Sequence, residues 1–506
     1  MLIAIRADAS STIGLGHLRR CLSLAQALRE VGASVRFAAR DSDVDAAAIV
    51  RADGFEADLL PSTAPLAGDA SAFCESLAGA RPDWVVVDHY GLDAAWHAAV
   101  RARLGCRVAA IDDLADRPLD VDALIDHNLV PPPGHRARYA PVLARDPKTW
   151  LCGPRFALLG PGYANARLAE VDGVVRSIGI FLGGTDPAAL TATAIDACRS
   201  VAGFVGPIEV ASTSANPRLD ELRSIAAHDP ALTLTIDQPD LAAFHARHGL
   251  QIGAGGGATW ERCCIGAPTL TLCVAANQLA VIPALRDLGV IATVERNDAP
   301  SIGAGVARLL ADPVERRGLA AAGRALVDGR GALRAALALV ATAPQAIRLR
   351  DAAASDARTM WEWRNAPVTR HASRLAQEIP FDAHQAWLTR ALADPARHLF
   401  IARFGQVDVG VIRFDQLADG ASYEVSLYLD PTLHGIGLGH AMLAAGEAAM
   451  AQRCGALVVH AEVLSDNPGS RRLFIASGYD IEAPTRFTKT LSARADAAAP
   501  LQESTP

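Results

Sequence analysis

Short apolar runs alternate with amphipathic stretches along the first part of the chain. The apolar runs are LIAIRAD (2–8), SVRFAAR (34–40), DWVVVDHY (83–90), CRVAAIDDL (106–114) and VDALIDHNLV (121–130). An amphipathic helix, HLRRCLSLAQALREVG, is predicted between the first two runs. Continuous apolar strands that are separated by helices are typical of a parallel sheet buried on both faces. The pattern therefore predicts a doubly wound α/β lobe over residues 1–160.

A second series of the same kind follows. Its predicted strands lie in VRSIGIFLGGTDP (175–187), PIEVAS (207–212), LTLTID (232–237), LQIGAGG (250–256) and APTLTLCVA (267–275). We predict a second doubly wound lobe over 161–345, which closes with a terminal helix and linker within 331–345. Ligands bind such sheets at the carboxyl ends of the strands.

From about residue 346 the pattern changes to period-two alternation. HLFIARF, QVDVGVIRF and SYEVSLYLD predict consecutive antiparallel strands. A helix over 439–453, the strand ALVVHAEVL and a last helix after Asn467 complete an α+β domain, which we place at 346–491. The Ala-, Ser- and Pro-rich tail, 492–506, is predicted to be disordered.

Composition excludes several classes of protein. The net charge of −7 over 506 residues provides no basic footprint for nucleic acid. The sequence contains no apolar run of about 18 residues, the length that a membrane span needs. The first apolar run meets Arg6 and Asp8 too early for a signal peptide, so we expect a cytoplasmic protein. The nine cysteines lack metal-ligand spacing, and we predict reduced thiols and no metal site.

Two Gly-rich turns carry the chemistry of the first two lobes. GLGHLRR (14–20) and GAGGGATWE (253–261) each lie between a predicted strand and a predicted helix. Glycine permits a close backbone approach, and a helix N-terminus offers unpaired N–H groups to an anion. Two such turns in successive lobes indicate a cleft for a nucleotide sugar. A dinucleotide site is disfavoured because Arg19 occupies the third glycine position of G-x-G-x-x-G.

An ordered series of motifs resembles one known family. The series is GLGHLRR, VVDHYG (86–91), IDDLADR (111–117), FLGGTDP (181–187) and GAGGGATWERCC (253–264), with Asn277-Gln278 downstream. Together the motifs resemble the nucleotide-sugar hydrolases of pseudaminic acid synthesis, over about residues 1–340. The resemblance implies a two-lobed glycosyltransferase-B-like fold and the release of UDP from a UDP-2,4-diacetamido-2,4,6-trideoxy sugar.

The resemblance also implies roles for individual residues. His17 is the expected catalytic residue, and an imidazole there is able to orient or deprotonate the attacking water near neutral pH. Glu261 is expected to accept hydrogen bonds from the ribose hydroxyls, with a plain helix-dipole role as the alternative. The expected substrate-binding set is Gly14, Gly16, Arg19, Asp88, Tyr90, Gly183, Gly184, Gly255, Gly256, Gly257, Glu261, Asn277 and Gln278.

Some of these roles stay open on the sequence. Tyr90 fits a sugar contact as well as a tyrosine that caps the core. Arg19 and Arg20 divide between cleft and surface, and the pattern does not tell which one faces inward. Gly183 and Gly184 fit either the pyrophosphate side of the cleft or a simple tight turn.

The segment LHGIGLGHAML (433–443), with SYEVSLYLD before it and DNPGSRRLFIASGY after it, is similar to the GNAT family of acyl-CoA-dependent N-acetyltransferases. His434 stands where Gln or Arg is usual. The resemblance implies acetyl-CoA as cosubstrate, its pyrophosphate on the backbone amides of 434–440 and its pantetheine arm along a splayed strand. The expected cofactor-binding residues are Leu427, Leu429, His434, Gly435, Gly437, Gly439, His440 and Asn467.

The catalytic groups of this domain are less defined. Phe474 stands where many family members have a tyrosine general acid, and this removes the hydroxyl. Glu424 is the expected proton relay, with a strand-edge charge as the alternative. Tyr423, Tyr428, His460 and Tyr479 are further candidates. The cluster Trp361, Trp363, Arg364 and Asn365 fits either a sugar-nucleotide wall or the core.

The two resemblances together predict a bifunctional enzyme. The GNAT domain would acetylate the 4-amino group of a UDP-4-amino-4,6-dideoxy sugar, and the two lobes would then hydrolyse the product to UDP and free sugar. A UDP-sugar glycosyltransferase fused to an acyltransferase is the alternative, because fold does not fix function. A non-catalytic nucleotide-sugar sensor is disfavoured by His17. The expected partners are the UDP-sugar and acetyl-CoA, and the sequence leaves the oligomeric state open.

Overall fold

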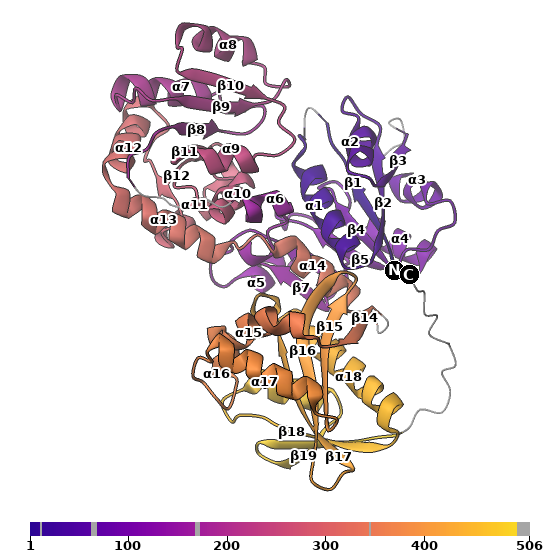
Figure 1. Ribbon diagram of the computed structural model, residues 1–506. Coiled ribbons are helices and arrows are strands. Elements are labelled where there is room, and N and C mark those ends of the chain that lie inside the picture. Colours follow the sequence, from indigo (N-terminus) through magenta and orange to yellow (C-terminus); the bar gives the residue numbers. More distant parts are fainter. Residues whose placement is uncertain (11–12, 62–67, 167–172, 344–345, 493–506) are drawn as a thin grey trace, which may run out of the picture. The chain divides into compact units, whose positions relative to one another are not determined.

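Three sheets organise the chain (Figure 1). The computed structural model describes residues 1–10, 13–61, 68–166, 173–343 and 346–492. The chain divides into two compact units, Met1–Leu28 with Ser34–Ala336, and Arg29–Ala33 with Leu337–Pro506. The first two sheets lie in the first unit and the third sheet lies in the second. The predicted disordered tail lies, from residue 493 on, outside the described residues.

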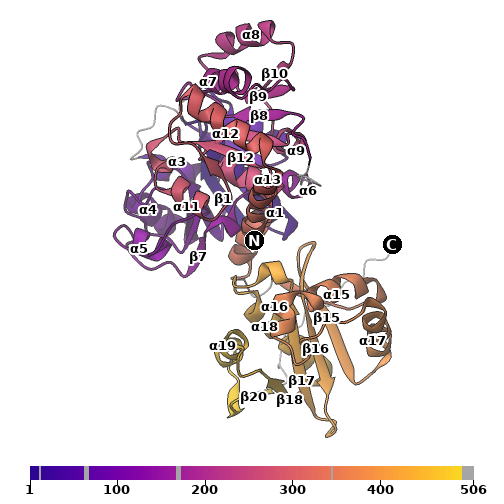
Figure 2. The same cartoon turned by 90° about the vertical axis from the view of Figure 1, so that its left-hand side faces the viewer.

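The first sheet has seven parallel strands in the order β3-β2-β1-β4-β5-β6-β7. The strands are β1 (Leu2–Ala7), β2 (Ser34–Arg40), β3 (Glu56–Leu60), β4 (Trp84–Asp88), β5 (Arg107–Ile111), β6 (Ala123–Asp126) and β7 (Thr149–Cys152). The helices are α1 (Gly16–Glu30), α2 (Ala46–Ala52), α3 (Asp69–Ser76), α4 (Ala94–Leu104), α5 (His135–Tyr139) and α6 (Pro161–Asn165), with the short η2 (Pro154–Phe156). Helices flank both faces of the sheet (Figures 1 and 2), so β4 is buried along its whole length.

The second sheet has six parallel strands in the order β10-β9-β8-β11-β12-β13. They are β8 (Ile178–Phe181), β9 (Ile208–Ser212), β10 (Leu232–Ile236), β11 (Leu250–Ala254), β12 (Thr269–Leu272) and β13 (Ala292–Thr293). The helices are α7 (Thr191–Asp196), η3 (Ala197–Val201), α8 (Leu219–His228), α9 (Ala242–Arg247), α10 (Ala258–Ile265), η4 (Ala276–Gln278), α11 (Val281–Asp287), α12 (Ala299–Ala311), α13 (Pro313–Leu326) and α14 (Gly331–Val340). Ile180, Ile252 and Leu270 of neighbouring strands are fully buried in its core.

The third sheet is mixed, in the order β14-β15-β16-β17-β18-β20-β19. Its strands are β14 (Ile347–Asp351), β15 (Arg397–Phe404), β16 (Val407–Gln416), β17 (Ser422–Leu429), β18 (Leu457–Glu462), β19 (Asp480–Ala483) and β20 (Arg486–Leu491). Its helices are η5 (Ala354–Asp356), α15 (Ala357–Asn365), α16 (Pro367–His371), α17 (Phe381–Ala393), η6 (Pro431–Leu433), α18 (Leu438–Cys454) and α19 (Pro468–Ala476). Only β17 and β18 pair in parallel; the other neighbours are antiparallel.

The sheet topologies confirm the predicted fold class, two doubly wound α/β lobes followed by an α+β domain. Every strand predicted in the first two lobes is present. The sequence pattern missed β3, β7 and β13, which are short strands at the edges of their sheets, and also the hairpin β19–β20. Edge strands are less buried than central ones, so they lack the continuous apolar run that identifies the others.

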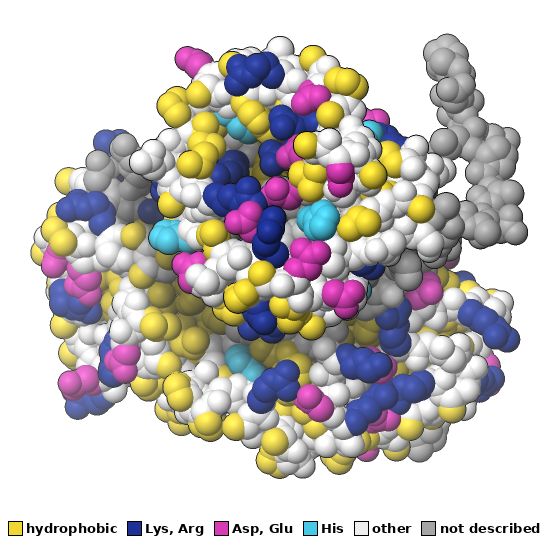
Figure 3. All heavy atoms as spheres, turned by 90° about the horizontal axis from the view of Figure 1, so that it is seen from below, with side chains coloured by type: hydrophobic (Ala, Val, Ile, Leu, Met, Phe, Trp, Pro, Cys, Tyr) yellow, Lys and Arg dark blue, Asp and Glu magenta, His cyan; other side chains and the backbone are white. Residues whose placement is uncertain are grey.

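On the face drawn in Figure 3, basic and acidic side chains are interspersed and form no continuous field of one sign. This agrees with the modest net charge of −7. No helix in the described ranges combines the length and the hydropathy that crossing a membrane requires.

Candidate functional site

The predicted turns of the first unit lie where the strand order of each sheet reverses. In the first sheet the chain winds outward from β1 through β2 to β3, then returns to place β4 on the other side of β1. The second sheet repeats this with β8 and β11. His17 follows β1 and Asp88 ends β4, while Gly183 follows β8 and Gly255 follows β11. Such switch points open a crevice at the carboxyl edge of the sheet, where α/β proteins bind ligands.

His17 lies in the first turn of α1 because the preceding loop reverses sharply. Gly14 has φ +75°, and its N–H donates to the Ser10 carbonyl at 2.8 Å. The left-handed backbone at Gly14 favours glycine, and α1 begins two residues later at Gly16. This geometry brings the His17 imidazole to the end of β4.

His17 and Asp88 form a hydrogen-bonded pair. His17 Nδ1 lies 2.6 Å from Asp88 Oδ1, with the Asp88 side chain fully buried and that of His17 12% exposed. Burial raises the pKa of Asp88, but Arg20 and His17 lower it more, so the carboxyl stays ionised with a pKa well below its usual range. An ionised carboxylate only accepts, so Nδ1 carries a proton, and in the neutral imidazole the lone pair is then on Nε2. This is the tautomer that a general base requires.

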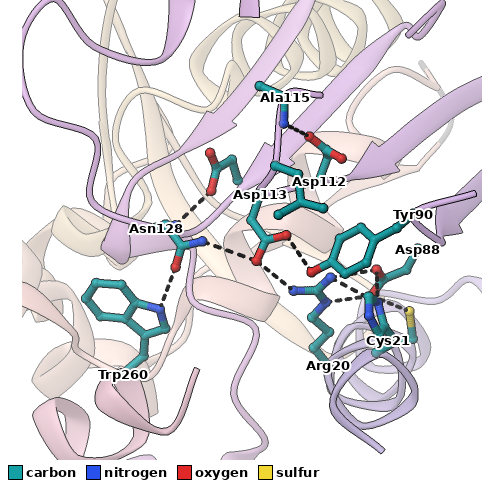
Figure 4. Close-up of polar contacts among 12 residues, drawn as sticks. Arg20, Cys21, Asp88, Tyr90, Asp112, Asp113, Ala115, Asn128 and Trp260 are labelled. Atoms are coloured by element: carbon teal, nitrogen blue, oxygen red, sulfur yellow. Dashed lines mark hydrogen bonds and ion pairs between the residues drawn. The ribbon is translucent and has the colours of Figure 1, made fainter. Parts of the chain in front are cut away.

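Arg20 is the inward-facing arginine of the pair that the sequence left open (Figure 4). Its Nε and Nη2 donate to the two oxygens of Asp88 at 2.5 and 2.6 Å, and its Nη1 lies 3.9 Å from Asp113 Oδ2. Arg19 is exposed instead, and its Nη2 donates to the carbonyl of Gln238 at 3.2 Å. The buried guanidinium neutralises Asp88 and fixes its orientation toward His17.

Tyr90 lies beside His17 at the rim of the site. Its hydroxyl donates to Asp113 Oδ1 at 2.6 Å, and its ring meets the His17 imidazole edge-on with 4.6 Å between ring centres. Burial, followed by the charge of Asp113, raises the pKa of Tyr90, so the phenol keeps its proton. Since 38% of Tyr90 remains exposed, one edge of its ring is open to a ligand beside His17.

The polar network continues from Asp113 to the second lobe (Figure 4). Asn128, which follows β6, donates through Nδ2 to Asp113 Oδ2 at 3.4 Å. The Asn128 Oδ1 accepts from Trp260 Nε1 of α10 at 3.2 Å. A chain of polar contacts therefore links the histidine pair to the helix that begins at the second Gly-rich turn.

The second Gly-rich turn is braced from two sides. Gln278 Oε1 accepts from the backbone N–H groups of Gly255 and Val274, at 3.3 and 3.0 Å. The buried Arg262 donates to the Ala254 carbonyl at 2.6 Å, and burial lowers its pKa to about 10. The Gly255 amide is therefore engaged within the protein. The amides that follow, at Gly256, Gly257 and the start of α10, are the ones that the helix geometry directs at an anion.

Glu261 lies one turn into α10 and keeps an accessible face. Its Oε2 lies 3.4 Å from Nε2 of the buried His245, and 23% of its side chain is exposed. Burial raises the pKa of Glu261, but hydrogen bonding to His245 and Tyr163 and the charge of Arg262 lower it more, so the carboxylate stays ionised. Asn277 lies in η4 next to Gln278. Gly183, with φ +102°, and Gly184 form the turn after β8.

In the second unit, β17 and β18 separate as the sequence predicts. Their pairing covers only Ser422 to Glu424, while β17 continues beside β16 through Leu427 and Leu429. Beyond Glu424 the edge of β17 that faces β18 is no longer paired with it. A strand edge of this kind pairs with an extended ligand.

The loop after β17 has the geometry of an anion site. Gly435 and Gly437 have φ values of +80° and +89°, and Gly437 is the N-cap of α18. The helix that follows has 17 residues and includes Gly439 and His440 in its first turn. Its first N–H groups have no partner within the helix and point toward the loop that begins at His434.

Other predicted residues have structural partners here. Asn467 caps α19 by accepting from the Ser470 N–H at 3.0 Å. Arg374 Nη2 donates to Glu424 Oε1 and to Glu462 Oε2, both at 2.6 Å, so Glu424 is part of an ion-paired triplet. Phe474 packs edge-on against Tyr479 with 5.0 Å between ring centres.

The further catalytic candidates of this domain are mostly buried or bonded to other protein groups. Tyr479 is 5% exposed, and burial raises its pKa. Burial likewise raises the pKa of Tyr428, whose hydroxyl donates to the Met360 carbonyl at 3.5 Å. Tyr423 donates to Cys454 Sγ at 3.5 Å, and His460 Nδ1 lies 3.9 Å from Glu482. Among the described residues, no group of three His, Cys, Asp or Glu is arranged to hold a metal.

The geometry of the second unit agrees with the comparison to known families. Residues 357–479 match the acetyltransferase (GNAT) family. The second unit therefore carries a GNAT domain. A solved structure similar to it is the spermidine N-acetyltransferase of Vibrio cholerae in complex with CoA and spermine, at 16% identity over 29% of this chain and 93% of that one, with a TM-score of 0.24.

The chain is also similar to other proteins. The spore coat polysaccharide biosynthesis protein SpsG of Bacillus subtilis is 26% identical over 189 residues, which are 36% of this chain and 55% of SpsG. The match thus spans about half the length of that relative. MurG of Acinetobacter baumannii is similar at 12% identity over 66% of this chain and 97% of that one, with a TM-score of 0.47.

Several residues of both sites were missed by the sequence reasoning. Asp113 and Arg262 lie within the motifs IDDLADR and GAGGGATWERCC but were given no role, and Asn128 lies in a segment interpreted only as a strand. A signal was present, since polar residues follow β5 and β6 at the same sheet edge as Asp88. Arg374 gave no signal, because it lies in a loop with no motif around it.

Proposed function

We propose that this protein is a bifunctional enzyme of pseudaminic-type (nonulosonic) acid biosynthesis. Its GNAT domain acetylates the 4-amino group of a UDP-4-amino-4,6-dideoxy sugar with acetyl-CoA. Its two-lobed unit then hydrolyses the UDP-2,4-diacetamido-2,4,6-trideoxy sugar to UDP and free sugar. The observation that carries the hydrolase is the His17–Asp88 pair at the switch point of the first sheet.

In the hydrolytic step, His17 Nε2 takes a proton from the water that attacks the anomeric carbon. The imidazolium that forms is stabilised by Asp88, which stays ionised throughout. The bond from the anomeric carbon to the phosphate oxygen breaks, and UDP leaves with the electron pair. The amides at the start of α10 stabilise the diphosphate, and Glu261 accepts from the ribose hydroxyls.

In the transfer step, the sugar amine attacks the thioester carbonyl of acetyl-CoA, which lies along the open edge of β17. The C–N bond of the amide forms as the C–S bond of the thioester breaks. The proton that the amine loses passes through Glu424 to the sulfur, and CoA leaves as the thiol. Arg374 donates to the same carboxylate at 2.6 Å, so this contact has to break for the Glu424 oxygen to accept the amine proton. The polysaccharide role in the name of SpsG supports a sugar substrate for the protein.

The order of the two steps is testable with one substrate. Acetylation first keeps the UDP group available for binding, and it supplies the acetamido group that Tyr90 and the η4 turn are proposed to recognise. Sites that hydrogen-bond a substrate group reject analogues that lack it. The UDP-4-amino sugar alone should therefore release UDP slowly, and acetyl-CoA should make the release fast.

The measurement is mass spectrometry of UDP and of the acetylated sugar over time. Equal UDP release with and without acetyl-CoA contradicts the proposed order of the two reactions and leaves the GNAT domain without a role before hydrolysis. Transfer of the sugar to an added acceptor, with no free sugar formed, would instead favour a glycosyltransferase fused to an acyltransferase.

A further inference from the structure

One face of the third sheet gathers basic side chains beside Glu424. In the register of β16 and β17, Glu424 pairs with Asp415, Ser426 with Arg413, and Tyr428 with Val411. Since alternate residues of a strand share a face, Glu424, Arg413 and Tyr428 lie on the same side of the sheet. Tyr428 and Val411 pack there against Met360 of α15 and Leu388 of α17, so these helices cover the face.

Three helices add basic groups to this face, and each group has one buried nitrogen without a hydrogen-bond partner, although Arg364 also donates through Nη2 to the Leu375 carbonyl at 3.1 Å. The three nitrogens are Nη1 of Arg364 on α15, Nε of Arg370 on α16 and Nε2 of His384 on α17, all buried. His384 is only 4% exposed. The residues beside Arg364 are satisfied: Trp361 donates to the Ile379 carbonyl at 2.6 Å, and Asn365 binds both the N–H and the carbonyl of Ile379. Trp361 and Asn365 are thus engaged within the protein, while Arg364 keeps an unused donor at Nη1.

The charges of this group, Arg364, Arg370, His384 and Arg413, act on one another. Burial lowers the pKa of Arg364, and the neighbouring Arg370 and Arg413 lower it further. Burial and then Arg364 lower the pKa of His384. Geometry places two of the groups together: the Arg413 guanidinium lies 5.8 Å from the centre of the Trp387 ring, and the His384 ring lies 5.4 Å from it. The directions of the pKa shifts agree with cations near one another.

The carboxylates nearby do not balance the group. Asp415 lies 2.8 Å from Arg413, but it also accepts from Arg397 at 2.5 Å. Glu378 lies 3.9 Å from Arg370, and its side chain is 70% exposed. A surplus of partly buried cationic donors with unused hydrogen-bonding capacity is suited to a polyvalent anion.

We propose that Arg364, Arg370, Arg413 and His384 bind the diphosphate of the nucleotide-sugar acceptor while its amine lies at Glu424. This deepens the proposed function and rests on it. Arg413 stands opposite Ser426, two residues and about 7 Å along the strand from Glu424. The 4-amino group and the anomeric phosphate lie at opposite ends of the pyranose ring, so one sugar spans the two groups. The pyrophosphate of CoA has its own site at the loop before α18.

The test compares Arg364→Gln with Arg358→Gln. Arg358 lies on the same helix with 64% of its side chain exposed, and its ion pair is with Glu362. Arg364→Gln should raise the KM for the UDP-4-amino sugar about ten- to a hundredfold, the scale of losing charge-assisted hydrogen bonds. Its KM for acetyl-CoA and its slow acetylation of the free 4-amino sugar should not change. Arg358→Gln should behave like the wild type.

An equal loss of acetylation with the UDP-4-amino sugar and with the free 4-amino sugar would show that Arg364 only supports the fold. An unchanged KM for the UDP-4-amino sugar would show that the diphosphate does not bind at this site. A second readout does not depend on turnover. In calorimetry with UDP on the full chain, Arg364→Gln should bind one equivalent fewer than the wild type and Arg358→Gln. Identical UDP stoichiometry in all three proteins would overturn the proposal. A further outcome is that Arg364→Gln binds one UDP fewer while the wild type fails to acetylate the UDP-amino sugar. That result would confirm an anion site at Arg364 but refute the UDP-amino sugar as its ligand.

Discussion

Replacing Asp88 by asparagine tests the chemistry of the first site with little change in shape. The Asp88 carboxylate accepts from His17 Nδ1 at 2.6 Å in a position where its side chain is fully buried. The amide of asparagine presents an N–H group toward Nδ1 when its oxygen stays on Arg20. Nδ1 then becomes the acceptor, and the neutral imidazole carries its proton on Nε2, the atom that must receive one. The variant keeps His17 in place but in the wrong tautomer.

The expected loss in UDP release is about 10²- to 10⁴-fold, the range from losing a general base to fixing the wrong tautomer. His17→Ala should lose at least about 100-fold, with acetyl transfer unchanged. Since both residues act as a unit, the double variant should be no slower than the slower single variant. The stability cost arises at Arg20, because breaking a buried charge pair typically costs about 3–5 kcal/mol. Arg20 keeps its ion pair with Asp113, so we expect a smaller cost.

The assay is UDP release from the acetylated UDP-sugar, with acetyl transfer measured on the same preparation as the control for folding. Near-normal UDP release by folded Asp88→Asn would refute the tautomer argument. Additive losses in the double variant would show that Asp88 and His17 act separately.

Three further predictions concern the rest of the chain. Glu261→Gln should raise the KM for the UDP-sugar about tenfold. EDTA should leave UDP release unchanged. Activity that vanishes with EDTA and returns with a divalent ion would show that the site depends on a metal. Fragments 1–345 and 346–506 should fold and work separately, the first releasing UDP and the second transferring acetyl groups, and insoluble or inactive fragments would show that the boundary is misplaced. Burial raises the pKa of Asp126 to about 7, so the folded state holds a proton that the unfolded chain releases near pH 4. The contribution of Asp126 to stability should therefore fall between pH 4 and 7, and Asp126→Asn should flatten this decline in thermal unfolding; an unchanged pH profile would contradict it.

The apolar pattern was sufficient for the architecture. Central strands such as β4 and β11 are buried on both faces, so each appears in the sequence as a continuous apolar run. The order of these runs predicts the two lobes. The Gly-rich turns were equally legible, because the positive φ values at Gly14, Gly435 and Gly437 favour glycine. The strand splay after Glu424 also followed from the resemblance and is present in the register.

The partners of the site residues were decided by the tertiary structure. The sequence contains Arg19 and Arg20 side by side, and only the packing of α1 against β4 turns Arg20 toward Asp88. Gln278 lies more than twenty positions after the glycine turn, yet its side chain accepts a hydrogen bond from the Gly255 amide. The position of Glu424 on a predicted strand suggested a proton relay. Its ion pair with Arg374, which lies in a distant segment, is visible only in the folded chain.

The difference has a physical cause. Backbone conformation and burial periodicity are local properties, and a short stretch of sequence records them. Ionisation, tautomer and unused hydrogen-bonding capacity depend on which charges meet in a buried space, as for His17 with Asp88 or Arg364 with Arg413. The sequence by itself determined where the strands, turns and candidate groups lie, and only the folded chain decided which of those groups share a proton.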